Sequence, residues 1–188
     1  MTTLANRSKT ALVVIDVQNG VVENAFNRNA VVANIGIAVA AARSAGVPVI
    51  WVQDLSVKEE SGEQAWNIVA ELEVLPQELS VHKNFRSSFE QTNLEQLLAE
   101  HGVGHLVVCG AESNNCLRHT AHSALDRGYD VTLISDAHTS NGYEWDGHEI
   151  SAEQVVHEQN DNFTDYKLPG RKAEIIKAAD LTFTSEIN

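Results

Sequence analysis

Short apolar runs alternate along the chain with longer amphipathic stretches. The β-branched run over residues 10–16, which ends in a carboxylate, predicts a buried strand. Residues 30–45 carry apolar side chains at helical spacing, and Gly46 stands where a helix commonly ends. Residues 47–52 predict a second strand. The first quarter of the chain therefore has the strand–helix–strand order of a parallel sheet.

The alternation continues to the end of the chain. Residues 64–71 predict a short helical turn, and residues 81–83 predict a short strand. Thr92 and Glu95 match a capping box, which predicts a helix ending at Gly102. The later expected elements are a strand over 104–109, a helix over 114–127 stopped by Gly128, a strand over 130–135, a helix from the Ser151–Gln154 capping box to about residue 160, a helix over 171–179 and a strand over 181–183.

Strands and helices that alternate through short loops predict an α/β fold. We expect a three-layer sandwich with a mostly parallel, Rossmann-like sheet of about six strands. A chain of 188 residues fits one domain with a sizeable core, so residues 1–188 are expected to form a single domain.

Composition narrows the classes of partner. A formal net charge of −13 argues against a nucleic-acid surface, because no basic stripe is present to neutralise phosphates. No run of 18 apolar residues predicts a membrane span, and the polar first nine residues lack the apolar segment of a secretory signal. The two cysteines make no disulfide framework. We therefore expect a cytoplasmic protein with a small-molecule substrate and no nucleic-acid or membrane partner.

Residues 110–116, with the sequence GAESNNC, are the most informative segment of the chain. They lie between an apolar strand and a predicted helix. A cysteine at a helix N-terminus is made more acidic by the helix dipole, and the free N–H groups there can stabilise an oxyanion. Free cysteines are also often small buried hydrophobes, and Cys109 fits that description inside its strand. Position alone leaves both readings open for Cys116.

Asp16 and Lys83 each fall at the end of a predicted strand, where open α/β sheets bind ligands. The ordinary roles of such residues are a turn-capping carboxylate and a solvated surface lysine. With Cys116 they form a plausible catalytic unit. Asp16 would take the thiol proton and later deliver it to a leaving amine, while Lys83 would keep Asp16 ionised and favour the thiolate.

Several ordered segments resemble the isochorismatase-like cysteine hydrolase family. They are ALVVIDVQN at 11–19, KNFRSSF at 83–89, TNL at 92–94, GAESNNC at 110–116, TA at 120–121, RGYD at 127–130 and DAHTS at 136–140. The similarity runs from residue 10 to about residue 140. It implies the isochorismatase-like hydrolase fold, a homo-oligomer, and a catalytic triad of Asp16, Lys83 and Cys116.

The resemblance also implies a cis peptide bond between Ala111 and Glu112. This bond would aim the Glu112 N–H beside the Cys116 N–H to form an oxyanion hole. Many relatives have an uncharged residue where this chain has Glu112. A carboxylate beside an oxyanion is unfavourable unless it points away, stays protonated or meets a cationic substrate.

No metal or cofactor is expected. Metal-bearing nicotinamidase relatives carry an Asp-x-His arrangement after the second strand, and residues 53–56, with the sequence QDLS, lack that histidine. His119 and His122 lie three residues apart but have no obvious third ligand, so packing or surface roles are favoured for them. The residues expected to line the substrate pocket are Gln18, Trp66, Phe85 and His119, although aromatic residues more often belong to the core.

We predict a hydrolase that cleaves a C–N bond of a small amide-type molecule through a thioester on Cys116. Members that act on isochorismate itself do without the cysteine, which makes an isochorismatase-type reaction the less favoured reading. Two further alternatives stay open: a catalytically silent member that binds a small metabolite, and a redox sensor that uses Cys116. A dinucleotide oxidoreductase is disfavoured because no Gly-x-Gly-x-x-Gly follows the first strand.

Overall fold

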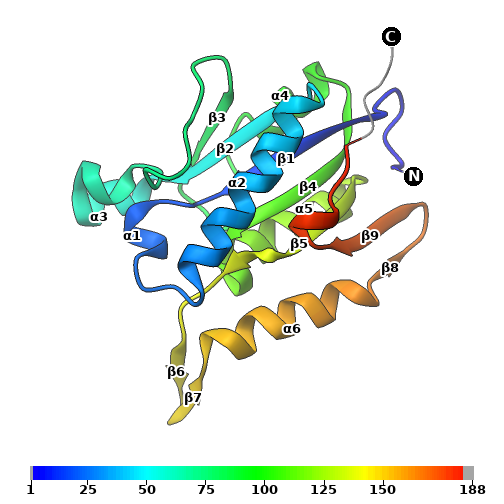
Figure 1. The fold of residues 1–188 in the computed structure, drawn as a ribbon. Helices are drawn as coiled ribbons and strands as arrows, with labels where there is room; N and C mark the ends of the chain where they lie inside the picture. Colours follow the sequence, from blue (N-terminus) through cyan, green and yellow to red (C-terminus); the bar gives the residue numbers. More distant parts are fainter. Residues whose placement is uncertain (1, 184–188) are drawn as a thin grey trace.

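A seven-stranded sheet forms the centre of the protein in the computed structural model, which describes residues 2–183 (Figure 1). All neighbouring strands pair in parallel except the short β8 at one edge, which is antiparallel to β9. The sheet order is β3 (Leu79–Lys83), β2 (Val49–Asp54), β1 (Lys9–Ile15), β4 (Val103–Ala111), β5 (Asp130–Thr139), β9 (Arg171–Ile176) and β8 (Lys167–Leu168). The predicted α/β class and mostly parallel sheet are confirmed, with one strand more than expected.

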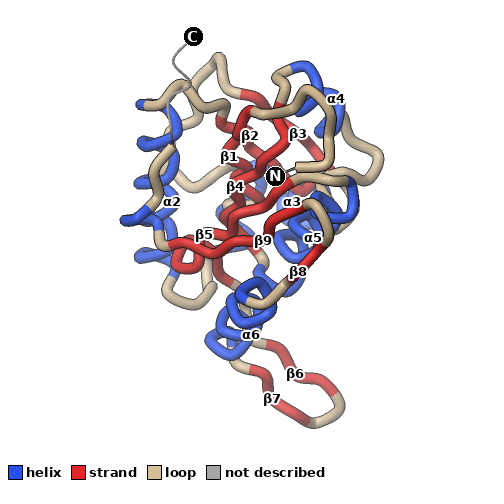
Figure 2. The backbone as a smooth tube through the Cα atoms, turned by 90° about the vertical axis from the view of Figure 1, so that its right-hand side faces the viewer, coloured by secondary structure: helices blue, strands red, loops and turns tan. Residues whose placement is uncertain are grey.

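Helices cover both faces of this sheet (Figure 2). One face packs against α2, and the other packs against α4, α5 and α6. The helical elements are α1 (Asn19–Val22), α2 (Arg28–Ser44), α3 (Leu55–Trp66), α4 (Leu94–Glu100), the π-helical turn η1 (Ser113–Leu117), α5 (Arg118–Arg127), α6 (Ala152–Thr164) and the 3₁₀ turn η2 (Ala178–Asp180). No helix among the described residues is both long and apolar enough to cross a membrane.

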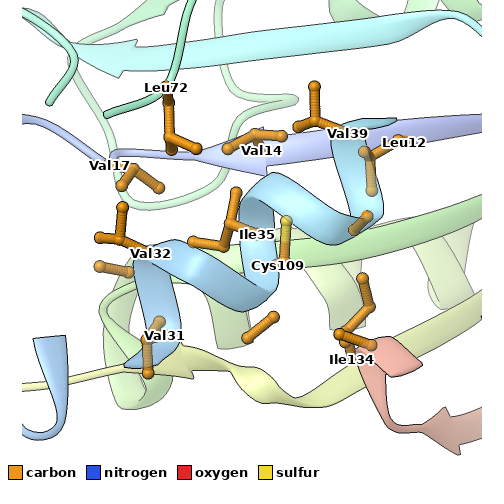
Figure 3. Close-up of a cluster of buried hydrophobic side chains, with 14 of the residues drawn as sticks. Leu12, Val14, Val17, Val31, Val32, Ile35, Val39, Leu72, Cys109 and Ile134 are labelled. Carbon is orange, nitrogen blue, oxygen red and sulfur yellow. The ribbon is translucent and has the colours of Figure 1, made fainter. Parts of the chain in front are cut away.

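Burial on both faces explains the unbroken apolar run of β1. Leu12 and Val14 point into the cluster under α2, which Figure 3 shows, whereas Val13 and Ile15 point into the cluster under α5. Successive strand side chains point to opposite faces, so a central strand covered on both sides needs an apolar residue at every position. Cys109 lies fully buried in the α2 cluster, and this burial raises the pKa of its thiol.

The end of the chain differs from the prediction. Residues 171–179 form strand β9 and the turn η2, and residues 181–183 form no strand. Along β9 the more buried Ala173 and Ile175 alternate with the exposed Lys172 and Glu174. Pairing with β5 outweighs the helix propensity of this short segment, because the sheet edge gives both its backbone and its alternating apolar side chains a partner.

Two other local predictions are wrong, and one hairpin was not predicted. The helix predicted at 64–71 instead covers Leu55–Trp66, where no residue is buried and so no apolar stripe marks it. Asn93, not Thr92, is the N-cap residue of α4, although Thr92 Oγ1 accepts a hydrogen bond from the backbone N–H of Leu94 and donates one to the carbonyl of Ser88. The hairpin of β6 (Tyr143–Trp145) and β7 (His148–Ile150) was not predicted, and it projects from the body (Figure 2). The Ser151 capping box of α6 is confirmed.

Gly110 lets the ends of β1 and β4 approach closely. It pairs in register with Ile15 and has a φ of +117°. A Cβ built at Gly110 would lie 2.0 Å from the carbonyl oxygen of Ile15. Only glycine fits both constraints, so this residue sets the distance between the residue after β1 and the loop after β4.

Replacing Gly110 with alanine is expected to lower the free energy of unfolding by more than about 3 kcal/mol, because the new methyl group meets backbone atoms at a positive φ. Gly46→Ala is the matched control, since Gly46 also has a positive φ but nothing lies within 4 Å of its Cβ position. That control should cost about 1 kcal/mol. Urea unfolding of both variants measures the difference, and equal losses would contradict the close-approach argument.

Candidate active site

Four neighbouring strands bring four reactive side chains together at their carboxyl ends. Asp16 follows β1, Asp54 ends β2 and Lys83 ends β3, while Cys116 lies in η1 after β4. The sheet order β3-β2-β1-β4 places these ends side by side. Residues up to 100 positions apart in the chain therefore meet at one edge of the sheet, where parallel sheets commonly bind ligands.

The ammonium group of Lys83 is the centre of this cluster. Its Nζ lies 2.8 Å from Asp16 Oδ2, 2.6 Å from Asp54 Oδ2 and 3.2 Å from Cys116 Sγ. The side chain of Lys83 is fully buried. Burial alone would lower its pKa, but the charges of Asp16 and Cys116 and the hydrogen bonds to both carboxylates raise the pKa above its usual value. Lys83 is therefore a fixed positive charge.

Asp16 is a buried carboxylate held in an unusual backbone conformation. Its φ is +49°, and its backbone N–H donates to the carbonyl of Val52 on the neighbouring strand. Burial raises the pKa of Asp16 to about 6, although the charge of Lys83 works in the opposite direction. Asp16 is thus ionised at neutral pH yet basic enough to accept a proton, as a general base requires.

The thiol of Cys116 is less acidic than its position in the sequence suggested. Burial and the negative charge of Asp16 raise its pKa to about 12, although Lys83 works in the opposite direction. Cys116 lies inside a single π-helical turn in which Asn115 departs from helical geometry, with φ −115° and ψ −108°. The expectation of a thiol acidified by a helix terminus is therefore wrong. The resting site holds a neutral thiol beside an ionised carboxylate.

Asp54 was missed as a member of this site. From the sequence, Asp54 was considered only as part of residues 53–56, which lack the histidine of a metal site. Burial favours its neutral form, but hydrogen bonds from Lys83 and Ser56 outweigh that effect and hold the pKa of Asp54 below its usual value. The available signal was its place at the end of an apolar strand, which is the same signal that drew attention to Asp16.

Gln18 braces Asp54 and does not line an open pocket. Its Oε1 accepts a hydrogen bond of 2.8 Å from the backbone N–H of Asp54, and its Nε2 donates to the carbonyl of the same residue at 3.2 Å. Gln18 is fully buried. The prediction that it contacts substrate gives way to a supporting role, because both ends of its amide are used to fix the end of β2.

The three other expected pocket residues lie at different depths. Lys58 Nζ lies over the ring of Trp66, 4.7 Å from the ring centroid, and the ring of Trp66 packs edge-on against that of His82. Phe85 is 45% exposed. His119 is exposed, and its Nδ1 lies 2.8 Å from the carbonyl oxygen of Asn115, the residue before Cys116. Phe85 and His119 are thus available to a ligand, whereas the Trp66 ring already has protein contacts.

Asp16, Asp54 and Cys116 also have the spacing of a metal site. One ligand atom from each lies within 4.8 Å of the others. Lys83 Nζ is in contact with all three residues, so the positive charge that such a cluster needs is already supplied by the protein. The three ligand atoms therefore already surround the ammonium group of Lys83, and this arrangement suits that side chain better than a resident metal ion.

The loop before Cys116 has a cis peptide bond between Ala111 and Glu112. The carboxylate of Glu112 accepts two hydrogen bonds, from Asn115 Nδ2 at 2.7 Å and from Asn141 Nδ2 at 2.8 Å. Both carboxylate oxygens are therefore engaged by side-chain amides of the surrounding loops. These contacts explain how a carboxylate is accommodated in the segment that leads to Cys116.

The rate at which iodoacetamide alkylates Cys116 is expected to rise through an apparent pKa of about 6, because ionised Asp16 accepts the thiol proton. Above that limb the rate should level off up to pH of about 9, whereas an ordinary cysteine gains rate up to its pKa of about 8.5. Cys116→Ala controls for labelling elsewhere, and Asp16→Asn should abolish the limb. A rate that climbs steadily from pH 6 to about 8.5 would contradict this assignment.

Asp54→Asn is expected to shift this acid limb to lower pH. The substitution removes a negative charge that raises the pKa of Asp16, and it leaves Lys83 with one carboxylate fewer to pair with. Alkylation rates measured across the limb test the shift. Asp161→Asn, an exposed substitution on α6, is the control for loss of one charge. A limb that stays in place or moves to higher pH would show that Asp54 does not act on Asp16.

A family model for the isochorismatase domain matches residues 10–163. A Bacillus subtilis protein described as the isochorismatase family protein YddQ is 30% identical over 155 residues, covering 78% of this chain and 86% of its own length. A streptothricin hydrolase of Streptomyces noursei is 33% identical over 145 residues, or 74% of this chain and 58% of that protein. A ureidoacrylate amidohydrolase of Pantoea ananatis is 27% identical over 179 residues, or 73% and 72% of the two chains.

The fold comparison agrees with the sequence comparison. The crystal structure of an isochorismatase from Pseudomonas putida superposes with a TM-score of 0.83 at 28% identity, covering 94% of this chain and 92% of that chain. The family match spans four fifths of the sequence and includes Asp16, Lys83 and Cys116. It confirms the resemblance stated from the sequence motifs. The chain belongs to the isochorismatase family of hydrolases.

Proposed function

We propose that this protein is a cysteine-dependent amidohydrolase that cleaves a C–N bond of a small molecule through a thioester on Cys116. The observation that carries the proposal is the contact of Lys83 Nζ with Asp16, Asp54 and Cys116 at once. An ammonium, a basic carboxylate and a thiol in mutual contact are the groups that nucleophilic attack on an amide needs. The relatives named streptothricin hydrolase and ureidoacrylate amidohydrolase support this class of substrate.

Acylation begins with proton transfer from the thiol to Asp16. As Cys116 Sγ bonds to the amide carbon, the carbonyl oxygen gains negative charge, and the N–H groups of Glu112 and Cys116 stabilise it by donating hydrogen bonds to that oxygen. Asp16 then donates its proton to the leaving nitrogen, and the C–N bond breaks. The amine departs, and the acyl group stays on sulfur as a thioester.

Deacylation reuses the same groups. A water molecule gives a proton to Asp16 while its oxygen bonds to the thioester carbon, and the same two N–H groups hold the second oxyanion. The C–S bond breaks, and sulfur recovers the proton from Asp16. The acid product leaves, and the neutral thiol and ionised carboxylate are restored.

Lys83 and Asp54 set the electrostatics of both steps. When the thiol proton moves to Asp16, negative charge moves from the carboxylate to sulfur, and Lys83 Nζ is in contact with both positions. The ammonium therefore stabilises the charge before and after the transfer. Asp54 holds Lys83 in place from the other side through its 2.6 Å contact.

The redox-sensor alternative lacks a partner thiol. Cys109 lies in the cluster under α2, whereas Cys116 packs against the cluster on the opposite face of the sheet. These are the only two cysteines of the chain, so a sulfenic acid on Cys116 would have no resolving thiol within the subunit.

The silent alternative has one observation in its favour. A relative from Arabidopsis thaliana that is 32% identical over 155 residues is named a probable inactive nicotinamidase. Alkylation of Cys116 separates the two readings, because a silent member has no need for a general base beside its thiol.

We further propose a cytoplasmic homo-oligomer that needs no metal or cofactor and has no nucleic-acid or membrane partner.

Screening a panel of small amides for release of ammonia or amine should identify a substrate. Cys116→Ala is expected to lower its turnover by at least about 10⁴-fold, and Asp16→Asn by a similar order, because each removes a group that acts in both half-reactions. Cys109→Ala is the matched cysteine control and should keep most of the activity. Full turnover by either active-site variant would overturn the proposal.

The thioester has its own test. Hydroxylamine added during turnover should divert part of the acyl group to a hydroxamate, and rapid acid quenching should leave the acyl mass on the peptide that contains Cys116. Release of product with neither signal, at a rate insensitive to hydroxylamine, would favour direct attack by water.

A further inference from the structure

Three consecutive residues of the segment that leads from β4 to Cys116, residues 112–114, bond to the last residues of β5 and the loop after it. The pairs are Glu112 Oε1 with Asn141 Nδ2 at 2.8 Å, Ser113 Oγ with His138 Nδ1 at 2.8 Å, and Asn114 Oδ1 with Ser140 Oγ at 2.9 Å. All three are contacts between side chains far apart in sequence. The loop that precedes Cys116 is therefore tied to its neighbour at every residue from 112 to 114.

The middle contact belongs to a longer chain of hydrogen bonds. Asn160 Nδ2 donates to the carbonyl of Ser135 at 3.0 Å, which turns Asn160 Oδ1 toward His138 Nε2, also at 3.0 Å. An amide oxygen can only accept, so Nε2 carries the proton of the imidazole. Nδ1 is then an acceptor, and the hydroxyl of Ser113 donates to it. The chain has one consistent direction from end to end.

Ser113, His138 and Asn160 have the order of a nucleophile, a base and an orienting residue, but they do not form a second catalytic site. Ser113 is fully buried and His138 is 1% exposed, so no substrate reaches the hydroxyl. Burial also holds the pKa of His138 below its usual value and keeps the imidazole neutral. A buried, fully directed chain of this kind fixes position.

We propose that His138 is a positioning residue that holds Ser113, and through it the loop whose Glu112 and Cys116 N–H groups face the oxyanion. The inference rests on the proposed function, because the oxyanion role of those N–H groups belongs to that mechanism. Along the sequence, Ser113 lies between Glu112 and Cys116, which supply the two N–H donors. Oxyanion donors act only when they are held near productive geometry, so fixing the residue between them serves both.

Two substitutions of His138 divide its two hydrogen bonds. In His138→Asn the side-chain amide occupies the position of Nδ1 and can still accept from Ser113, while the contact with Asn160 is lost. In His138→Gln the terminal amide reaches the position of Nε2 and can still donate to Asn160, while the contact with Ser113 is lost. Both variants remove the ring, so they form a matched pair.

A small aldehyde such as propionaldehyde probes the oxyanion hole without a known substrate. Cys116 Sγ bonds to the aldehyde carbon, the C=O π bond breaks, and the thiol proton passes through Asp16 to the oxygen, giving a hemithioacetal. Its oxygen lies where the substrate oxyanion would lie. Its dissociation constant is read as protection of Cys116 from iodoacetamide, and the unprotected alkylation rate reports on the thiol alone.

We expect His138→Gln to weaken aldehyde binding by about 10-fold or more, and His138→Asn to bind within about 3-fold of the parent protein. The unprotected alkylation rate and its acid limb should stay unchanged in both. Ser113→Ala, which removes one hydroxyl and keeps the imidazole, should behave like His138→Gln and serves if the histidine variants fail to fold.

Equal aldehyde affinity in the Asn and Gln variants would overturn the role of His138, as would an alkylation rate that falls in parallel with affinity, which signals general disorder of the site. If the aldehyde protects Cys116 from iodoacetamide equally well in the parent protein, in His138→Gln and in Ser113→Ala, this inference is refuted and the proposed function still stands. Parent protein without any protection would refute the oxyanion hole itself, and the inference with it.

Discussion

The buried ammonium of Lys83 is the interaction on which the site depends. A lysine taken out of water at the end of a strand would lose its proton unless carboxylates compensated it, and two do so at 2.6 and 2.8 Å. The compensation works only because β2 lies next to β3, β1 lies next to β2, and the three strands end at the same edge of the sheet. In return the ammonium keeps the two carboxylates from repelling each other at close range. Strand order, and not local sequence, therefore creates the charge balance that the chemistry uses.

The same balance leaves the resting thiol neutral. With the pKa of Asp16 near 6 and that of Cys116 near 12, the shared proton stays on sulfur until a substrate arrives. In the proposed mechanism proton transfer is coupled to formation of the S–C bond, because the carbonyl oxygen takes up the negative charge as sulfur gives it away. A thiol held this way gains protection from adventitious oxidation, since oxidants react with the thiolate. In that mechanism the oxyanion donors matter as much as the base, because they supply the stabilisation that drives the transfer.

Sequence reasoning succeeded where a pattern is local and failed where a distant group decides. The apolar run over residues 10–16 correctly predicted strand β1, and Gly128 correctly predicted the end of helix α5. Strand β9 was read as a helix because its six residues suit either state until β5 offers a pairing partner. The pKa of Cys116 was predicted in the wrong direction because the helix-terminus rule ignores burial and the charge of Asp16. Asp54 was overlooked because its role exists only through Lys83, which lies 29 positions further along the chain.

Positioning of the site is divided between two kinds of support. The acid and the ammonium are held by strand ends, through ladder pairing and the close approach at Gly110. Cys116 and its neighbouring N–H groups are held by the preceding loop, through side-chain contacts to the last residues of β5 and the loop after it. The carboxylate of Glu112 belongs to this second support, because its two oxygens join amides from two loops at once. Its charge is thereby directed into the loop contacts, which accounts for an acidic residue at a position where an oxyanion is expected.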